Sequence, residues 1–155
     1  MTITEPATMI TDYLLAIAGT IFAIQTFRLR HLHRATILWF LAFAFGAAAA
    51  LLGGTYHGFK LSFSPDTAKA LWDTTMILIG ACAGFLTAAT IISSLRRSEL
   101  EYVRWLKRGL LISAAGFAIQ KIGLDIHTHF NHNDIYHVIQ IGGFWCLYEG
   151  AKRMR

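Results

Sequence analysis

Apolar residues occur in five long blocks along the chain, and polar residues gather in the segments between them. A helix needs about 20 mostly apolar residues to cross the roughly 30 Å of hydrocarbon in a bilayer, and the blocks approach or exceed that length. None of them alternates strictly between apolar and polar positions, as the strands of a membrane β-barrel do. The pattern predicts an all-α fold, a single polytopic membrane domain over residues 1–155 with about five transmembrane helices. The predicted spans are 13–27, 35–54, 68–95, 103–123 and 135–151.

Residues typical of helix starts precede three of these spans. A serine or asparagine can cap the first free amides of a helix, and a proline or an acid suits its first turn. A serine followed three residues later by a glutamate is the capping-box pattern. The predicted start signals are Ser64-Pro65-Asp66 before the third span, Ser98 with Glu101 before the fourth, and Asn133-Asp134 before the fifth.

Composition and charge indicate a membrane protein with a defined orientation. Hydrophobic residues make up 55% of the 155 residues and charged residues only 15%, and the mean hydropathy of +0.48 is too high for an ordinary soluble domain. Eleven of the fourteen lysines and arginines follow the first, third or fifth span, so they lie on alternate ends of the helices. By the positive-inside rule, this asymmetry predicts that the N-terminus is outside and the C-terminus is cytoplasmic.

The same features suggest which partners the protein has. The net charge of +5 favours contact with anionic lipid head groups, and no basic patch interleaved with aromatic residues points to nucleic acid. Small residues recur at four-residue spacing in three spans, which predicts close helix packing within the chain, against a second copy, or against subunits of a larger complex. Glu5 and Asp12 precede the first span without any lysine or arginine, so we expect no cleaved signal peptide.

Histidines concentrate at one end of the predicted bundle. Five of the seven map to the outer side, namely His57, His127, His129, His132 and His137. Asp73 joins them from within the third span, where an ionisable side chain costs several kcal/mol unless it faces the bundle interior and has a partner. His57 ends the second span and His137 lies in the first turn of the fifth, so we expect both beside Asp73.

This combination of side chains suits a zinc ion. Zinc in catalytic sites commonly takes three protein ligands and a water whose pKa it lowers to about 7. The predicted ligands are His57, His137 and Asp73, and Asp73 could instead accept a proton from the water. A further nitrogen is predicted to come from His132, with His129 or His127 as alternatives. The simpler interpretation is that the loop histidines are solvated and that Asp73 only hydrogen-bonds one histidine.

Three short patches of the chain resemble a superfamily of membrane metal hydrolases. The patches are Thr55-Tyr56-His57, Trp72-Asp73 and Tyr136-His137. They are similar to alkaline ceramidases and to progestin and adipoQ receptors, which place a histidine at the end of the second helix, an aspartate early in the third and histidines on the last. The resemblance implies zinc held by histidines and hydrolysis of an amide bond in a lipid. The chain has Gly53 where that superfamily has a serine, and five predicted spans where it has seven.

The leading functional prediction is a membrane-embedded zinc hydrolase that acts on a lipid amide or ester near the outer leaflet. Three alternatives use the same features differently. The minimal loops and small-residue faces also fit a non-enzymatic subunit of a larger membrane complex. His57 and His137 could ligate a haem iron axially from facing helices. Asp73 could belong to a proton or ion pathway.

Overall fold

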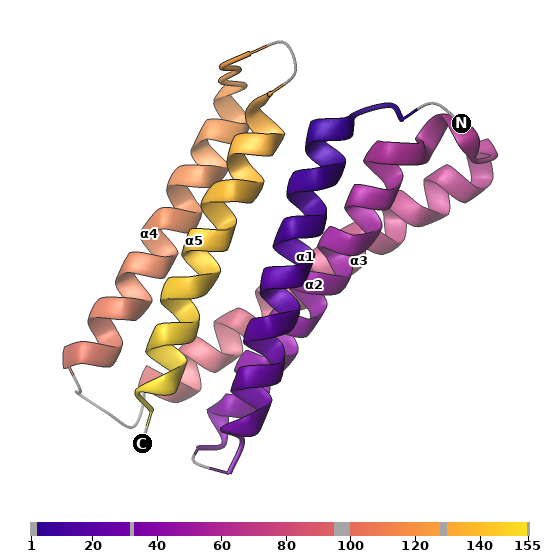
Figure 1. Cartoon of the computed structure of the whole chain (residues 1–155). Coiled ribbons are helices and arrows are strands. Elements are labelled where there is room, and N and C mark those ends of the chain that lie inside the picture. Colours follow the sequence, from indigo (N-terminus) through magenta and orange to yellow (C-terminus); the bar gives the residue numbers. More distant parts are fainter. Residues whose placement is uncertain (1–2, 32, 95–99, 128–129, 155) are drawn as a thin grey trace.

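The computed structural model describes residues 3–31, 33–94, 100–127 and 130–154, and these parts form an all-α bundle (Figure 1). The predicted fold class is confirmed: the described residues contain five α-helices and a 3-10 turn, with a single bridge between His127 and Phe130 and no named strand. The helices are α1 (Pro6–Arg28), α2 (Ala35–Phe59), α3 (Pro65–Ser94), α4 (Leu100–Ile122) and α5 (His132–Lys152), and the 3-10 turn is η1 (Lys60–Ser62).

The start of α3 follows its predicted signal, and the start of α5 does not. Ser64 Oγ accepts a hydrogen bond from the Thr67 amide at 3.2 Å, and Pro65 is the first residue of α3. The prediction that Asn133 caps the fifth helix is wrong, because Asn131 occupies the cap in an extended conformation. Its side chain accepts from the Asn133 amide at 2.8 Å, while Asp134 accepts from the Asn131 amide at 2.7 Å.

The predicted cap at Ser98 lies outside the described residues. The first helix also begins earlier than its apolar block indicates, at Pro6 instead of residue 13. Proline suits the first turn of a helix because its missing amide hydrogen has no intrahelical partner there. This extra stretch carries Asp12 and Thr11 into the helix.

The helices pack in a curved row rather than in sequence order. The principal contacts join α1 to α2 and α5, α2 to α3, and α4 to α5, so the spatial order is α4, α5, α1, α2, α3. One apolar core draws on all five helices near the end that holds the C-terminus, and it includes Trp39, Phe43, Ala89, Tyr102 and Leu147. At the opposite end, α3 diverges from α4 and α5 (Figure 1). The bundle is therefore closed at one end and open at the other.

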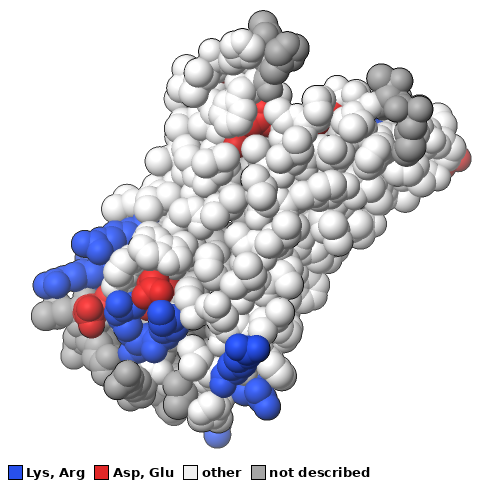
Figure 2. All heavy atoms as spheres, viewed as in Figure 1, with Lys and Arg blue, Asp and Glu red and all other residues white. Residues whose placement is uncertain are grey.

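The outer surface of the bundle suits a hydrocarbon environment. Three helical segments are long and apolar enough to cross a membrane: α1, α2 continued through η1, and α3. Large apolar side chains lie on the surface, with Ile77 71% and Leu111 70% exposed. Figure 2 shows lysines and arginines gathered mainly at the end of the molecule near the C-terminus, below a broad uncharged band. That distribution is the one on which the predicted orientation rests.

The small residues of α2 pack against other helices, whereas two glycines of α3 do not. On α2, Ala42, Gly46, Ala50 and Gly54 are all buried against neighbouring helices, as the four-residue spacing predicts. On α3, a methyl group added at Gly80 or Gly84 would meet nothing within 4 Å. The face of α3 that carries these two glycines is therefore uncovered in the single chain.

Candidate functional site

A cavity of about 640 Å³ opens between the diverging helices, and all five helices line it. Its polar lining comes from residues near the open end of the bundle, and its apolar lining extends toward the closed end. The polar residues are Asp12, His57, Trp72, Thr75, Gln120, Lys121, Asn133, Tyr136, His137, Gln140 and Ser113. The apolar residues include Leu15, Met76, Ile79, Ala83, Leu86 and Phe144. A second hollow of about 790 Å³ lies between α1 and α2, but its lining is almost wholly apolar.

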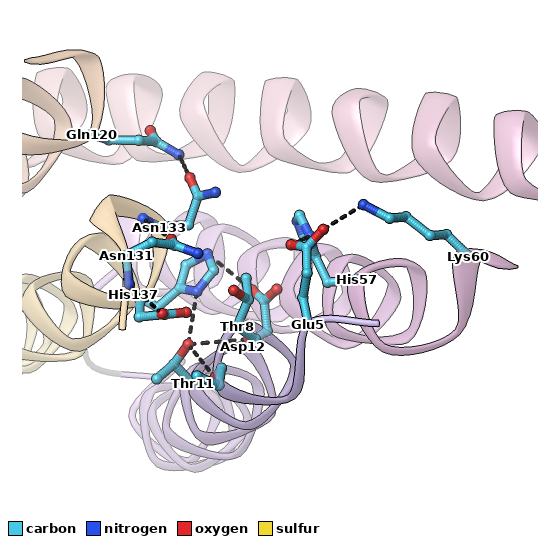
Figure 3. Close-up of polar contacts among 12 residues, drawn as sticks. Glu5, Thr8, Thr11, Asp12, His57, Lys60, Gln120, Asn131, Asn133 and His137 are labelled. Carbon is cyan, nitrogen blue, oxygen red and sulfur yellow. Dashed lines mark hydrogen bonds and ion pairs between the residues drawn. The ribbon is translucent and has the colours of Figure 1, made fainter. Parts of the chain in front are cut away.

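One buried polar contact at the cavity joins α1 to α5. His137 Nε2 lies 3.2 Å from Asp12 Oδ1, and His137 Nδ1 lies 3.1 Å from Thr11 Oγ1 (Figure 3). Both side chains of this contact are buried, with residue exposures of 4% for Asp12 and 8% for His137. Burying a carboxylate is costly unless it is paired. The imidazole therefore accounts for how α1 tolerates Asp12 inside the bundle.

Two arrangements of the hydrogens are compatible with the contacts of His137. The Thr11 hydroxyl lies 3.1 Å from two backbone carbonyls, of Ala7 and Thr8. If Thr11 donates to a carbonyl, His137 Nδ1 must donate to Thr11, and a second proton must lie between Nε2 and Asp12. If Thr11 donates to Nδ1 instead, Nε2 carries the ring's only proton and donates it to Asp12. In both cases a proton lies between Asp12 and His137.

Two adjacent glycines of α2 allow Asp12 to reach this position. A Cβ at Gly54 would lie 2.9 Å from Asp12 Cβ and from the Tyr13 ring, which is closer than real Cβ contacts. A Cβ at Gly53 would lie 3.4 Å from Asp12 Oδ2. The close approach of α1 and α2 therefore depends on residues without side chains, as is common where helices pack in membranes.

A second carboxylate orients the other cavity histidine. Glu5, just before α1, lies 2.8 Å from His57 Nδ1 and also forms an ion pair with Lys60 (Figure 3). Burial tends to raise the pKa of Glu5, but the hydrogen bonds and charges of Lys60 and His57 outweigh it and hold that pKa below its ordinary value. The Thr4 amide also donates to the Gly58 carbonyl at 3.0 Å. These contacts fix the segment before α1 against the end of α2.

The ring orientation of His57 leaves one nitrogen for the cavity. With Nδ1 facing Glu5, its Nε2 makes no hydrogen bond to a described residue. The His57 ring also lies 6.1 Å from the Trp72 ring and 5.6 Å from the Tyr56 ring, centroid to centroid and edge to face. A carboxylate that holds Nδ1 sets the tautomer and makes Nε2 the reactive nitrogen.

Of the four residues predicted to bind a metal, the structure brings only His57 and His137 to the cavity. Asp73 lies elsewhere: its side chain is 52% exposed and forms an ion pair with Lys69, one turn earlier on α3. The reason is helical periodicity, because Trp72 and Thr75 line the cavity and position 73 points to another face.

His132 also lies outside the cavity lining. Its Nδ1 is 2.8 Å from Asp125 Oδ1, in the connection before α5. The hydrogen bonds from His132 lower the pKa of the Asp125 carboxyl. His127 forms a bridge with Phe130 in the same connection, and His129 lies outside the described residues.

The donor geometry does not fit a zinc site. Among the described residues, no group of three or more histidine, cysteine, aspartate or glutamate side chains could hold a metal ion. Both ring nitrogens of His137 already face protein oxygens. Zinc binding therefore stays a prediction from the sequence, and we assign no chemical step to it.

The three residues that contact the cavity histidines were not predicted to do so: Glu5, Thr11 and Asp12. The available signal was Asp12, a lone carboxylate within one residue of a long apolar block. An acid beside a membrane-spanning block needs a partner when it is buried among helices.

Comparison with known proteins places the chain in a family. Residues 7–107 and 92–155 match a family described as a family of unknown function, DUF6962. The chain belongs to DUF6962. Searches of curated proteins and of solved structures gave no match. Because the DUF6962 description names no activity, the resemblance to alkaline ceramidases and the related receptors stays a prediction.

Proposed function

We propose that this DUF6962 protein is a multi-pass membrane protein that binds a lipid-like amphiphile in the cavity between its helices. The observation that carries the proposal is the cavity itself. Its volume of about 640 Å³ is typical of small-molecule sites, which measure roughly 300–1,000 Å³. Asp12, His57 and His137 lie at its open end, whereas Leu86 and Phe144 lie toward its closed end. This polarity matches a molecule with a polar head and an apolar tail.

In this proposal all five helices cross the bilayer, with the N-terminus outside and the C-terminus cytoplasmic. The helices α4 and α5 are less apolar than the others, but part of their polar content lines the cavity, including Gln120, His137 and Gln140. Polar side chains that face an internal cavity are compatible with a membrane span. The polar end of the cavity then lies near the outer leaflet.

The arrangement of the helices supplies a route from the lipid phase. The helices α3 and α4 are the two ends of the curved row, and each packs mainly on one neighbour. Both line the cavity, so the gap between them at the open end would face lipid. An amphiphile could enter sideways without its tail crossing water.

Lipid analysis of the purified protein tests the proposal. Ala83 of α3 is exposed on the cavity wall, so Ala83→Trp should fill the cavity without disturbing helix packing. Ile77→Trp is the control, because Ile77 is 71% exposed and is not in the cavity lining. After purification in mild detergent, mass spectrometry should find about one retained amphiphile per chain in the wild type and in Ile77→Trp. Ala83→Trp should have lost it. Equal retention by both variants, or none by the wild type, would overturn the proposal.

A second candidate function is hydrolysis of a lipid ester or amide, favoured by the Glu5–His57 contact. His57 Nε2 could take a proton from a water as the water oxygen attacks the carbonyl carbon. The proton would then pass to the departing alkoxide or amine, so the bond to the carbonyl carbon breaks and an acid is released. Release of labelled fatty acid by the wild type but not by His57→Gln would support this chemistry.

The remaining predictions from the sequence have direct tests. Haem between His57 and His137 would give a Soret absorption band in the purified protein. Membership of a larger complex would give stoichiometric copurification of other membrane subunits in mild detergent. Neither result would by itself contradict the proposed binding of an amphiphile in the cavity.

A further inference from the structure

The Asp12 carboxylate has one oxygen without a partner. Oδ1 lies 3.2 Å from His137 Nε2, whereas Oδ2 faces Gly53 and makes no hydrogen bond to a described residue. The residue is only 4% exposed and lines the cavity. Because Asp12 lines the cavity, this oxygen can accept a hydrogen bond from a ligand there.

The surroundings of Asp12 favour a cationic donor. Asp134, one turn before His137 on α5, is 1% exposed, and its Oδ1 has no hydrogen-bond partner among the described residues. Two buried carboxylates therefore lie close to a single imidazole, whereas the charge of Glu5 is already matched by Lys60. An anionic head group beside Asp12 would be repelled by that carboxylate, and Asp134 behind it adds to the negative charge of this end.

One lysine also belongs to the cavity lining. Lys121 lies in the last turn of α4, is exposed, and extends over the Phe117 ring at 5.5 Å. Phe117 is not part of the lining. The Lys121 charge therefore lies at the rim and can be hydrated, unlike the carboxylates at Asp12 and Asp134.

Aromatic rings complete the polar end. Trp72 and Tyr136 line the cavity from α3 and α5, and the Tyr56 ring packs 5.0 Å from Trp72, centroid to centroid. The face of an aromatic ring attracts an ammonium group, most strongly when the group is desolvated. Because Asp12, Trp72 and Tyr136 line the same cavity, an amine bound there can meet both a carboxylate and an aromatic ring.

We propose that the cavity selects amphiphiles with a protonated primary amine as head group, and that Asp12 Oδ2 accepts a hydrogen bond from this ammonium. The inference rests on the proposed amphiphile binding and adds the class of head group. Two further ammonium hydrogens remain for other acceptors of the polar end. The apolar tail lies along the lining toward Phe144.

Three probes of equal chain length test the inference: dodecylamine, dodecanol and dodecanoate. The full chain is placed in phosphatidylcholine nanodiscs at neutral pH, and binding of each labelled probe is corrected with empty nanodiscs. We expect dodecylamine to bind about tenfold or more tightly than dodecanol, because hydrogen bonds between charged groups are stronger than those of a neutral hydroxyl. Dodecanoate should bind most weakly. If no probe binds, the proposed function fails; if amine and alcohol bind equally, only the amine inference fails.

Two variants locate the preference. Asp12→Asn should reduce the amine-to-alcohol ratio to near one while dodecanol still binds, which shows that the cavity has folded. Gly53→Ser keeps Asp12 but places a hydroxyl beside Oδ2, where it can donate in place of the amine, so the ratio should also fall. Asp73→Asn is the matched control, because it removes an exposed carboxylate from α3. A preference for the amine that persists in both Asp12→Asn and Gly53→Ser would overturn the assignment.

Discussion

Asp12 and His137 lie 3.2 Å apart on α1 and α5, across a separation of 125 positions in the sequence. The contact lies where the α4–α5 pair meets the group formed by α1, α2 and α3. It therefore serves two purposes at once, because it fixes the two groups of helices together and orients Asp12 at the cavity wall.

Removing the imidazole should destabilise the protein more than removing an exposed histidine. His137→Ala leaves Asp12 buried without its partner, which should lower the free energy of unfolding by about 3 kcal/mol. His132→Ala is the control, because it removes only the exposed pair with Asp125 and should have little effect. Thermal unfolding in detergent measures both. Equal losses in the two variants would contradict a structural role for the Asp12 pair.

Glycine substitutions should separate the packed and open faces of the bundle. Gly54→Ala places a methyl group 2.9 Å from Asp12 Cβ, and overpacking of this kind costs about 1–3 kcal/mol. Gly84→Ala adds a methyl group that meets nothing within 4 Å, so helix propensity should stabilise α3 by up to about 1 kcal/mol. The unfolding midpoint should fall for the first variant and rise or stay for the second. A fall for Gly84→Ala would show that its face is covered.

The contacts of Glu5 should weaken in acid. Lys60 and His57 hold the pKa of Glu5 below its ordinary value of 4.5. A group whose pKa is lowered in the folded state contributes stability above its unfolded pKa, and this contribution is lost as the pH falls through the lowered folded value. Glu5→Gln should therefore be less stable than the wild type at pH 6, and the difference should shrink toward pH 3. A constant difference over this range would exclude the ionic contribution of Glu5.

Metal content can be measured independently of any activity. Because both nitrogens of His137 face protein oxygens and Asp73 points away from the cavity, we expect less than stoichiometric zinc after purification in a zinc-containing medium. Elemental analysis of the wild type and of His137→Ala gives the answer. About one zinc per chain, lost in the variant, would instead support the predicted zinc hydrolase and a rearranged His137.

The helices were predictable from the sequence because apolar blocks of this length are typical of membrane-spanning helices. The assignment of side chains to the cavity was harder. The residues Trp72 and Asp73 are adjacent in sequence, but a rotation of about 100° per residue separates them, and only Trp72 reaches the cavity. The place of a residue within an apolar block indicates how far along the helix it lies, but it does not show which side of the helix the residue is on. His57 and His137 both line the cavity, and each lies near the end of its span, but Asp73 does not join them there as expected.

The contact between His137 and Asp12 could not be predicted from the spacing of residues in the sequence. Asp12 precedes it by 125 positions, and their contact requires α1 to lie beside α5. No spacing rule in a single sequence indicates that α1 occupies the middle of the row. The carboxylate at position 12 was visible, but only the packing order shows which histidine it meets.

The order of the row also has consequences for biosynthesis. Of the five helices, α1 is made before the others but occupies the centre of the row, so its two faces are covered at different times. The α2 side can be covered once α2 has formed, whereas the α5 side must wait until α5 has been made. Until then Asp12 has no imidazole beside it. The cavity is thus completed only when α5 is in place, and a chain that stops after α3 would leave Asp12 without its imidazole partner.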